Sequence, residues 1–145
     1  NEDRAMLETV FVSAYCAAVS QIMDKTENFS VYGSIGEENY SFTVNENTIK
    51  GFAKLADAVS EGLKSGLCAK ASKVLVDHKS KGIVSVFAMN SNEESVFMQH
   101  ADFCLNCNLN RNRLYIAVSS NSVEEQYMEA VLNRFVIILK SVFRI

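Results

Sequence analysis

The chain has 145 residues and a mass of 16.1 kDa, so we expect a single globular domain over residues 1–145. Its 48% hydrophobic and 21% charged residues exclude disordered, collagen-like and low-complexity classes. The net charge of −3 and the pI of about 5.4 argue against nucleic acid or an anionic membrane as a partner. The longest uncharged apolar run, Phe135–Leu139, is far shorter than the ~20 residues of a membrane span, so we expect no transmembrane segment.

The first half of the chain predicts a helix, a hairpin and a second helix. Over residues 3–24, apolar residues recur at spacings of 3 and 4, which is typical of one stripe of an amphipathic helix. Residues 29–35 and 40–44 then alternate between apolar and polar, and the four residues between them suit a hairpin turn. Helical spacing resumes at residues 47–48 and continues to about residue 70.

The second half predicts strands with period-2 alternation. Lys73–His78 and Ile83–Met89 form a second hairpin in this interpretation. Ser95–Leu109 is either one long strand or two strands that meet at a bend, and the asparagine-rich stretch Asn106–Asn112 is expected to be a loop. Arg113–Ser119 is a further strand.

The closing helix has an unusually wide apolar stripe. It is expected to begin at Ser122, with Glu125 completing a capping box. A helix that covers only a sheet needs an apolar arc of roughly 100°, and a second apolar row beside the first implies burial against something else. Because this helix has more apolar surface than one fold can cover, we predict an interaction surface on it. That surface comprises Val131, Leu132, Phe135, Val136, Leu139 and Phe143.

The resulting order, α-β-β-α-β-β-β-β-α, predicts an α+β domain. In this domain, an antiparallel sheet of about five to six strands packs with three helices. The order resembles that of the profilin-like domains, particularly the roadblock and longin families, from Asp3 to Phe143. The resemblance implies a dimerising, non-catalytic platform for small GTPases or larger assemblies. It lies in the order of the elements, from which no site residue follows.

The cysteines favour an intracellular protein with reduced thiols. Cys16, Cys68, Cys104 and Cys107 are too few and too unevenly spaced for a disulfide scaffold. A core of this size also needs no covalent cross-links. We therefore expect a cytoplasmic protein.

The string from His100 to Cys107 is the most suggestive one for chemistry. Cys104-x-x-Cys107 with a nearby histidine resembles half a zinc knuckle, but period-2 alternation places the two thiols on opposite sides of a strand. His100, Asp102 and Cys104 share one face and form the candidate ligand or thiol site. Neighbouring positions on that face lie ~7 Å apart, which is too far for a direct hydrogen bond. We therefore predict no catalytic residue, no metal and no cofactor.

The sequence thus favours a non-catalytic adaptor or scaffold module that dimerises or joins a multi-protein assembly. Two alternatives stay open. The first is a small-ligand or sensor domain of the PAS type, in which His100, Asp102 or Tyr115 fixes a ligand between the sheet and a helix. The second is a small enzyme that uses Cys104 as nucleophile and His100 as base.

Overall fold

The computed structural model describes residues 2–22, 29–45, 51–66, 85–90, 102–110, 113–120 and 124–144. Its elements, in chain order, are α1 (Glu2–Ile22), β1 (Phe29–Ile35), β2 (Glu38–Val44), α3 (Phe52–Ser65), β3 (Ser85–Met89), β4 (Phe103–Asn110), β5 (Arg113–Ser120) and α6 (Glu125–Phe143). The predicted strand Lys73–His78, most of the predicted stretch before residue 102, and Ser122 lie outside the described residues.

Five described strands form one mixed sheet in the order β2-β1-β3-β4-β5. The α+β class is confirmed, but the prediction of a wholly antiparallel sheet is wrong. β1 pairs with β2, and β4 with β5, in antiparallel fashion, whereas β3 lies parallel to both β1 and β4. The alternation of a strand reveals which faces it has and not which strand lies beside it. The α3 crossover between β2 and β3 brings β3 beside β1, as a parallel pairing requires.

The predicted first hairpin is confirmed, with a shorter turn than the sequence suggested. Ile35 pairs with Glu38, so only Gly36 and Glu37 lie between β1 and β2. Gly36 has φ = 61°, a left-handed conformation that costs glycine little and that two-residue hairpin turns favour. Its N–H donates to the carbonyl oxygen of Met89 at 3.0 Å, which ties the turn to the end of β3.

Two boundary predictions in the second half are wrong. Asn106–Asn110 is not a loop, because β4 continues through it and pairs with β5 as far as Asn110. Cys107 within this stretch is buried in the core, and burial of that face outweighs the poor strand propensity of asparagine. The N-cap of α6 is Glu124, without a side-chain cap hydrogen bond, so the capping box predicted from Ser122 does not form there.

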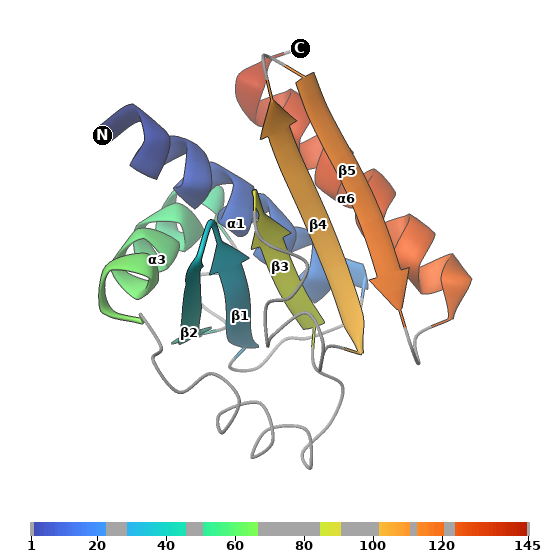
Figure 1. Cartoon of the computed structure of the whole chain (residues 1–145), viewed down its shortest axis with the longest axis horizontal. Helices are drawn as coiled ribbons and strands as arrows, with labels where there is room; N and C mark the ends of the chain where they lie inside the picture. The colour runs from blue at the N-terminus through green and yellow to red at the C-terminus, as the bar shows by residue number, and fades with distance from the viewer. Residues whose placement is uncertain are drawn as a thin grey trace.

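The three described helices cover one face of the sheet. Figure 1 shows α1, α3 and α6 behind the five strands, with α1 between the other two. α1 contacts both neighbouring helices and β3. Every residue from Phe11 to Ser20 is buried, so the amphipathic stripe predicted for this helix is wrong. A helix enclosed on all sides needs apolar or small side chains around its whole circumference.

The same composition gives α1 a second physical property. The segment Arg4–Ile22 is long and apolar enough to cross a membrane by length and composition alone, and 56% of it is buried within this fold. A central core helix meets the same criteria as a spanning helix. The expectation of no transmembrane segment therefore stays a prediction.

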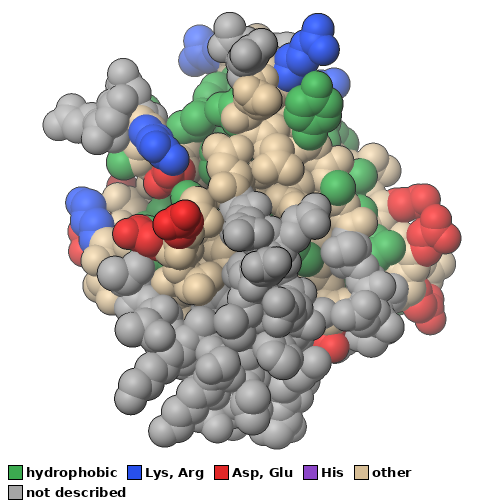
Figure 2. All heavy atoms as spheres, in the orientation of Figure 1, with side chains coloured by type: hydrophobic (Ala, Val, Ile, Leu, Met, Phe, Trp, Pro, Cys, Tyr) green, Lys and Arg blue, Asp and Glu red, His purple; other side chains and the backbone are tan. Residues whose placement is uncertain are grey.

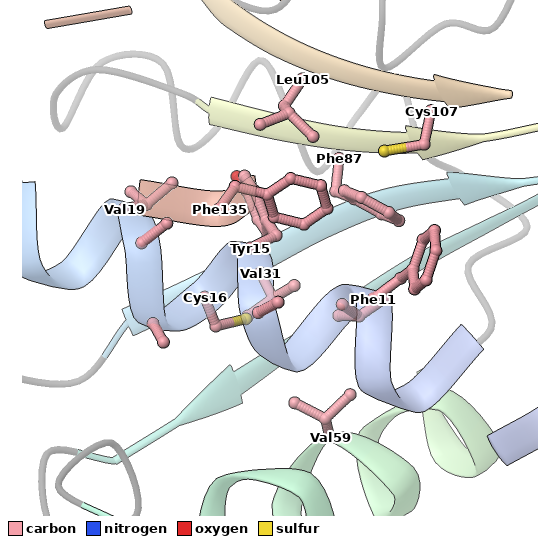
Figure 3. Packing of buried hydrophobic residues seen from close by; sticks show 14 of the residues in the cluster. Phe11, Tyr15, Cys16, Val19, Val31, Val59, Phe87, Leu105, Cys107 and Phe135 are labelled. Atoms are coloured by element: carbon pink, nitrogen blue, oxygen red, sulfur yellow. The ribbon is translucent and has the colours of Figure 1, made fainter. Parts of the chain in front are cut away.

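A chain of aromatic rings joins α1, β3 and α6 in the core (Figure 3). Tyr15 packs on Phe87 with ring centroids 5.4 Å apart, and Phe87 lies 6.3 Å from Phe135. Phe11 meets Phe135 edge to face, at 6.3 Å and 89°, and also contacts Phe143. Such pairs add about 0.5–1.5 kcal/mol each beyond the area that they bury.

α3 packs on β2 through a contact that only glycine permits. The ring of Phe42 lies where a Cβ of Gly62 would be placed. The N–H of Ser41 also donates to the carbonyl oxygen of Gly66 at 2.8 Å, which fixes the end of α3 against the same strand.

We predict that Gly62→Ala destabilises the protein by about 1–3 kcal/mol, because the added methyl group overlaps the Phe42 ring. This cost exceeds the roughly 1 kcal/mol that alanine gains over glycine inside a helix. Urea unfolding followed by circular dichroism measures the difference. Gly33→Ala is the matched control, since its Cβ would meet only the Phe87 carbonyl oxygen, at 3.5 Å. Equal stability of the Gly62→Ala variant and the wild type would contradict this packing.

Candidate functional site

The predicted ligand or thiol site is only partly within the described residues. Cys104 lies in β4 and Asp102 immediately before it, whereas His100 is outside the described residues. Asp102 is half-buried and Cys104 is buried. The structure therefore places two of the three groups at one end of β4, and the predicted pairing of Cys104 with His100 lies outside the described residues.

The prediction that Cys104 and Cys107 point to opposite sides of a strand is confirmed. Cys107 belongs to the core cluster beneath the helices (Figure 3), while Cys104 lies on the opposite face, between Val86 of β3 and Ser119 of β5 in register. Within the described part of the chain, no group of three His, Cys, Asp or Glu side chains is placed to hold a metal ion.

Burial makes both strand thiols poor nucleophiles. It raises the pKa of Cys104 to about 11, and burial together with the neighbouring Cys104 raises the pKa of Cys107 to about 12. Burial also raises the pKa of Cys16, a residue of α1 that is fully buried in the core. A reactive cysteine needs the opposite environment, one that is partly exposed and electropositive, because the thiolate is the nucleophile.

We predict slow alkylation of Cys104 in the folded protein. At pH 8 its raised pKa lowers the thiolate fraction roughly 100-fold relative to an ordinary thiol, and burial slows access further. Iodoacetamide labelling followed by peptide mass spectrometry measures the rate, which should rise with pH up to about 11. The thiol introduced by Ala53→Cys, at an exposed position of α3, is the control. A Cys104 thiol that reacts as fast as the control would restore the enzyme alternative.

α6 divides its apolar residues between the core and the surface. Val131, Phe135 and Leu139 form one buried row, three residues of the predicted interaction surface. Leu132 and Val136 are half-buried beside that row. Phe143, the last of the six, is 44% exposed. The six residues therefore do not share one accessible face.

Two apolar grooves flank the C-terminal half of α6. The first lies between α1, α3 and α6, and Ile137 and Val142 stand at its border with exposures of 55% and 36%. The second lies between the start of α1, the β4–β5 end of the sheet and α6. It is lined by apolar atoms, and its exposed apolar residues are Leu114 and Phe143, at 39% and 44%.

The sequence interpretation missed Leu114 and Ile137 as surface residues. A signal for Ile137 was present, because Val136-Ile137-Ile138-Leu139 is an uninterrupted apolar run. Consecutive helical residues are 100° apart, so four of them spread around the helix and one must point away from the core. No comparable signal marks Leu114, which lies near the end of the β4–β5 pair where Asn110 faces Arg113.

No protein-family model, curated protein or solved structure matches this chain. The strongest unexplained feature among the described residues is the exposed apolar surface at the end of α6.

Proposed function

We propose that this chain is a non-catalytic protein-binding module, of adaptor or scaffold type, that docks through the C-terminal half of α6. We name its docking surface the α6 surface and define it by the exposed residues Leu114, Ile137, Val142 and Phe143. This proposal keeps the expectation that the module dimerises or joins a larger assembly. It also keeps the expected cytoplasmic location and requires no cofactor.

The observation that carries the proposal is the exposure of large apolar side chains beside two apolar grooves. Single exposed apolar residues are ordinary, whereas residues grouped around a groove are typical of binding surfaces. A partner that covers Ile137 and Phe143 removes apolar area from water, which contributes about 25 cal/mol per Å² before the costs of association.

The proposal moves the interface outward from the position that the sequence suggested. Phe135 is fully buried and its ring contacts both Phe11 and Phe87, so a partner cannot reach it without opening the core. Ile137 and Val142 lie away from this buried row, beside the groove between α1, α3 and α6, and are exposed to solvent. These outward residues can be covered while the core stays closed.

The ligand-binding alternative receives less support from the second groove, between the start of α1, the β4–β5 end of the sheet and α6. Its described lining includes Leu109, Leu114 and Ile116, with Lys140 as its charged residue. Tyr115, proposed to fix a ligand, alternates with Leu114 and Ile116 and therefore lies on the opposite face of β5. A specific small-molecule site needs a few convergent polar groups, which the described lining does not supply.

We predict that a photoreactive residue at position 137 yields covalent adducts in the native cells. A benzoylphenylalanine side chain there lies inside the proposed interface and reacts with whatever covers it. The same group at Asp57, an exposed position on α3, is the control and should give background labelling only. Mass spectrometry of the adducts tells whether the partner is a second copy or another protein. Equal labelling at both positions would remove the support for the α6 surface.

A further inference from the structure

β5 has an outer edge that no described strand pairs with. It is the last strand in the sheet order, and its register with β4 runs without interruption over eight residues. Leu114–Val118 carries no charge and no proline. Proteins usually protect a long edge strand with lysine, proline or a bulge, because its free N–H and C=O groups form a template for another strand. The described part of β5 has none of these devices between Arg113 and Ser120.

Two hydrogen bonds on the other side of β4 reveal which groups of β5 point outward. The carbonyl oxygen of Cys107 accepts from Asn90 N–H at 2.9 Å, and the N–H of Leu109 donates to Asn90 Oδ1 at 2.8 Å. Odd-numbered residues of β4 therefore direct their backbone groups toward β3, and even-numbered residues toward β5. Asn106 and its partner Ala117 thus bond each other. It follows that the even-numbered residues of β5 direct their groups to the outer edge.

The outward groups belong to Leu114, Ile116, Val118 and Ser120. When two copies of such a strand pair in antiparallel fashion, residues that face each other have numbers with an even sum. A two-fold axis at Ala117 meets this condition over residues 114–120. It places Ile116 opposite Val118 and Ala117 opposite its own copy.

The same two-fold axis would also place the α6 helices of the two copies in antiparallel directions. By rise per residue, α6 is about 28 Å long and β5 about 27 Å, and the two elements contact each other. In Figure 1, α6 runs behind β4 and β5, and its N-terminal end reaches beyond the edge of β5 while its C-terminal end lies behind β4. The two-fold axis reverses the direction of α6 in the second copy. The N-terminal end of one α6, which reaches beyond β5, therefore lies toward the C-terminal end of the other α6, which lies behind β4.

The acidic and basic residues of α6 are divided between its two halves, so that two antiparallel α6 helices attract each other. Its N-terminal half carries Glu124, Glu125 and Glu129, and its C-terminal half carries Arg134, Lys140 and Arg144, all exposed. Figure 2 shows acidic side chains over the N-terminal end of α6 and basic ones at the opposite end of the molecule, near the C-terminus. This arrangement suits the helix dipole. It also makes two antiparallel α6 helices complementary, since Glu129 of one then lies near Lys140 of the other.

We infer that a second copy of this chain docks at the outer edge of β5, joined by antiparallel pairing of β5 with β5 about an axis at Ala117. The sheet then continues across both copies, and α6 packs beside α6. The inference rests on the proposed function and names the partner on the β5 side of α6, where Leu114 and Phe143 lie, whereas Ile137 and Val142 border the groove toward α3. A second copy satisfies the strand edge and the helix charges with one symmetry operation, which an extended peptide at the edge does not.

A cysteine at the axis tests the register. Ala117 is exposed, and in this dimer it faces its own copy in a non-hydrogen-bonded pair with Cα atoms ~4.5 Å apart, within disulfide range. We predict that mild oxidation converts most of the Ala117→Cys variant to a covalent dimer. Ala53→Cys, a matched exchange on α3, should cross-link at background level. Equal cross-linking of the two variants would overturn the register.

Charge variants test the same dimer in solution. Sedimentation equilibrium of the full chain should give twice the protomer mass of 16.1 kDa. Ala117→Lys places two lysines opposite each other and should weaken association about tenfold or more, with an unchanged circular dichroism spectrum. Lys140→Glu should also weaken it, and the double variant Glu129→Lys/Lys140→Glu should restore it, because the swapped charges again face their opposites.

The outcomes separate this inference from the proposed function. A wild-type chain that remains at 16.1 kDa at high concentration excludes the self-paired dimer. If position 137 then still cross-links to a different protein, the α6 surface stands and only its partner was wrong. If neither position 137 nor position 117 gives specific adducts, both proposals fail.

Discussion

The enclosure of α1 on every side is the constraint on which the rest of the fold depends. Ten consecutive buried residues, Phe11–Ser20, leave this part of the helix no solvent-facing side. Side chains on all of its sides must then be covered at once, by α3 and α6 on its flanks and by the sheet. The small residues of this stretch, such as Ala14 and Ala18, permit the close approach that such enclosure requires.

The arrangement of α6 follows from that constraint. Its buried row must close one side of α1, and Phe135 does so by contacting both Phe11 and Phe87. The helix carries more apolar residues than this single contact can use. Ile137 and Val142 therefore remain at the surface, beside a groove that α1 and α3 complete. The same packing that stabilises the core thus creates the surface that we propose for binding.

The sheet separates two environments for cysteine. Cys107 faces the helices and Cys104 the opposite side, yet both are buried and both have a raised pKa. A thiol in either environment is stabilised in its protonated form because burial removes the water that would solvate the thiolate. Chemistry at these positions is disfavoured for the same reason that packing is favourable there. Among the described residues, the outer edge of β5 and the α6 surface are the features that no described element covers.

Local patterns in the sequence were sufficient for the three described helices, the first hairpin, the strand character of β3 and β5, the α+β class and the opposite orientations of Cys104 and Cys107. Each of these depends on residues close together in the chain, whose periodicity or turn chemistry is visible in the sequence. Other features depend on distant segments: the parallel pairing of β3, the strand character of Asn106–Asn110, the full burial of α1 and the exposure of Ile137. Strand partners and helix neighbours are selected by burial summed over the whole core, which no local pattern encodes.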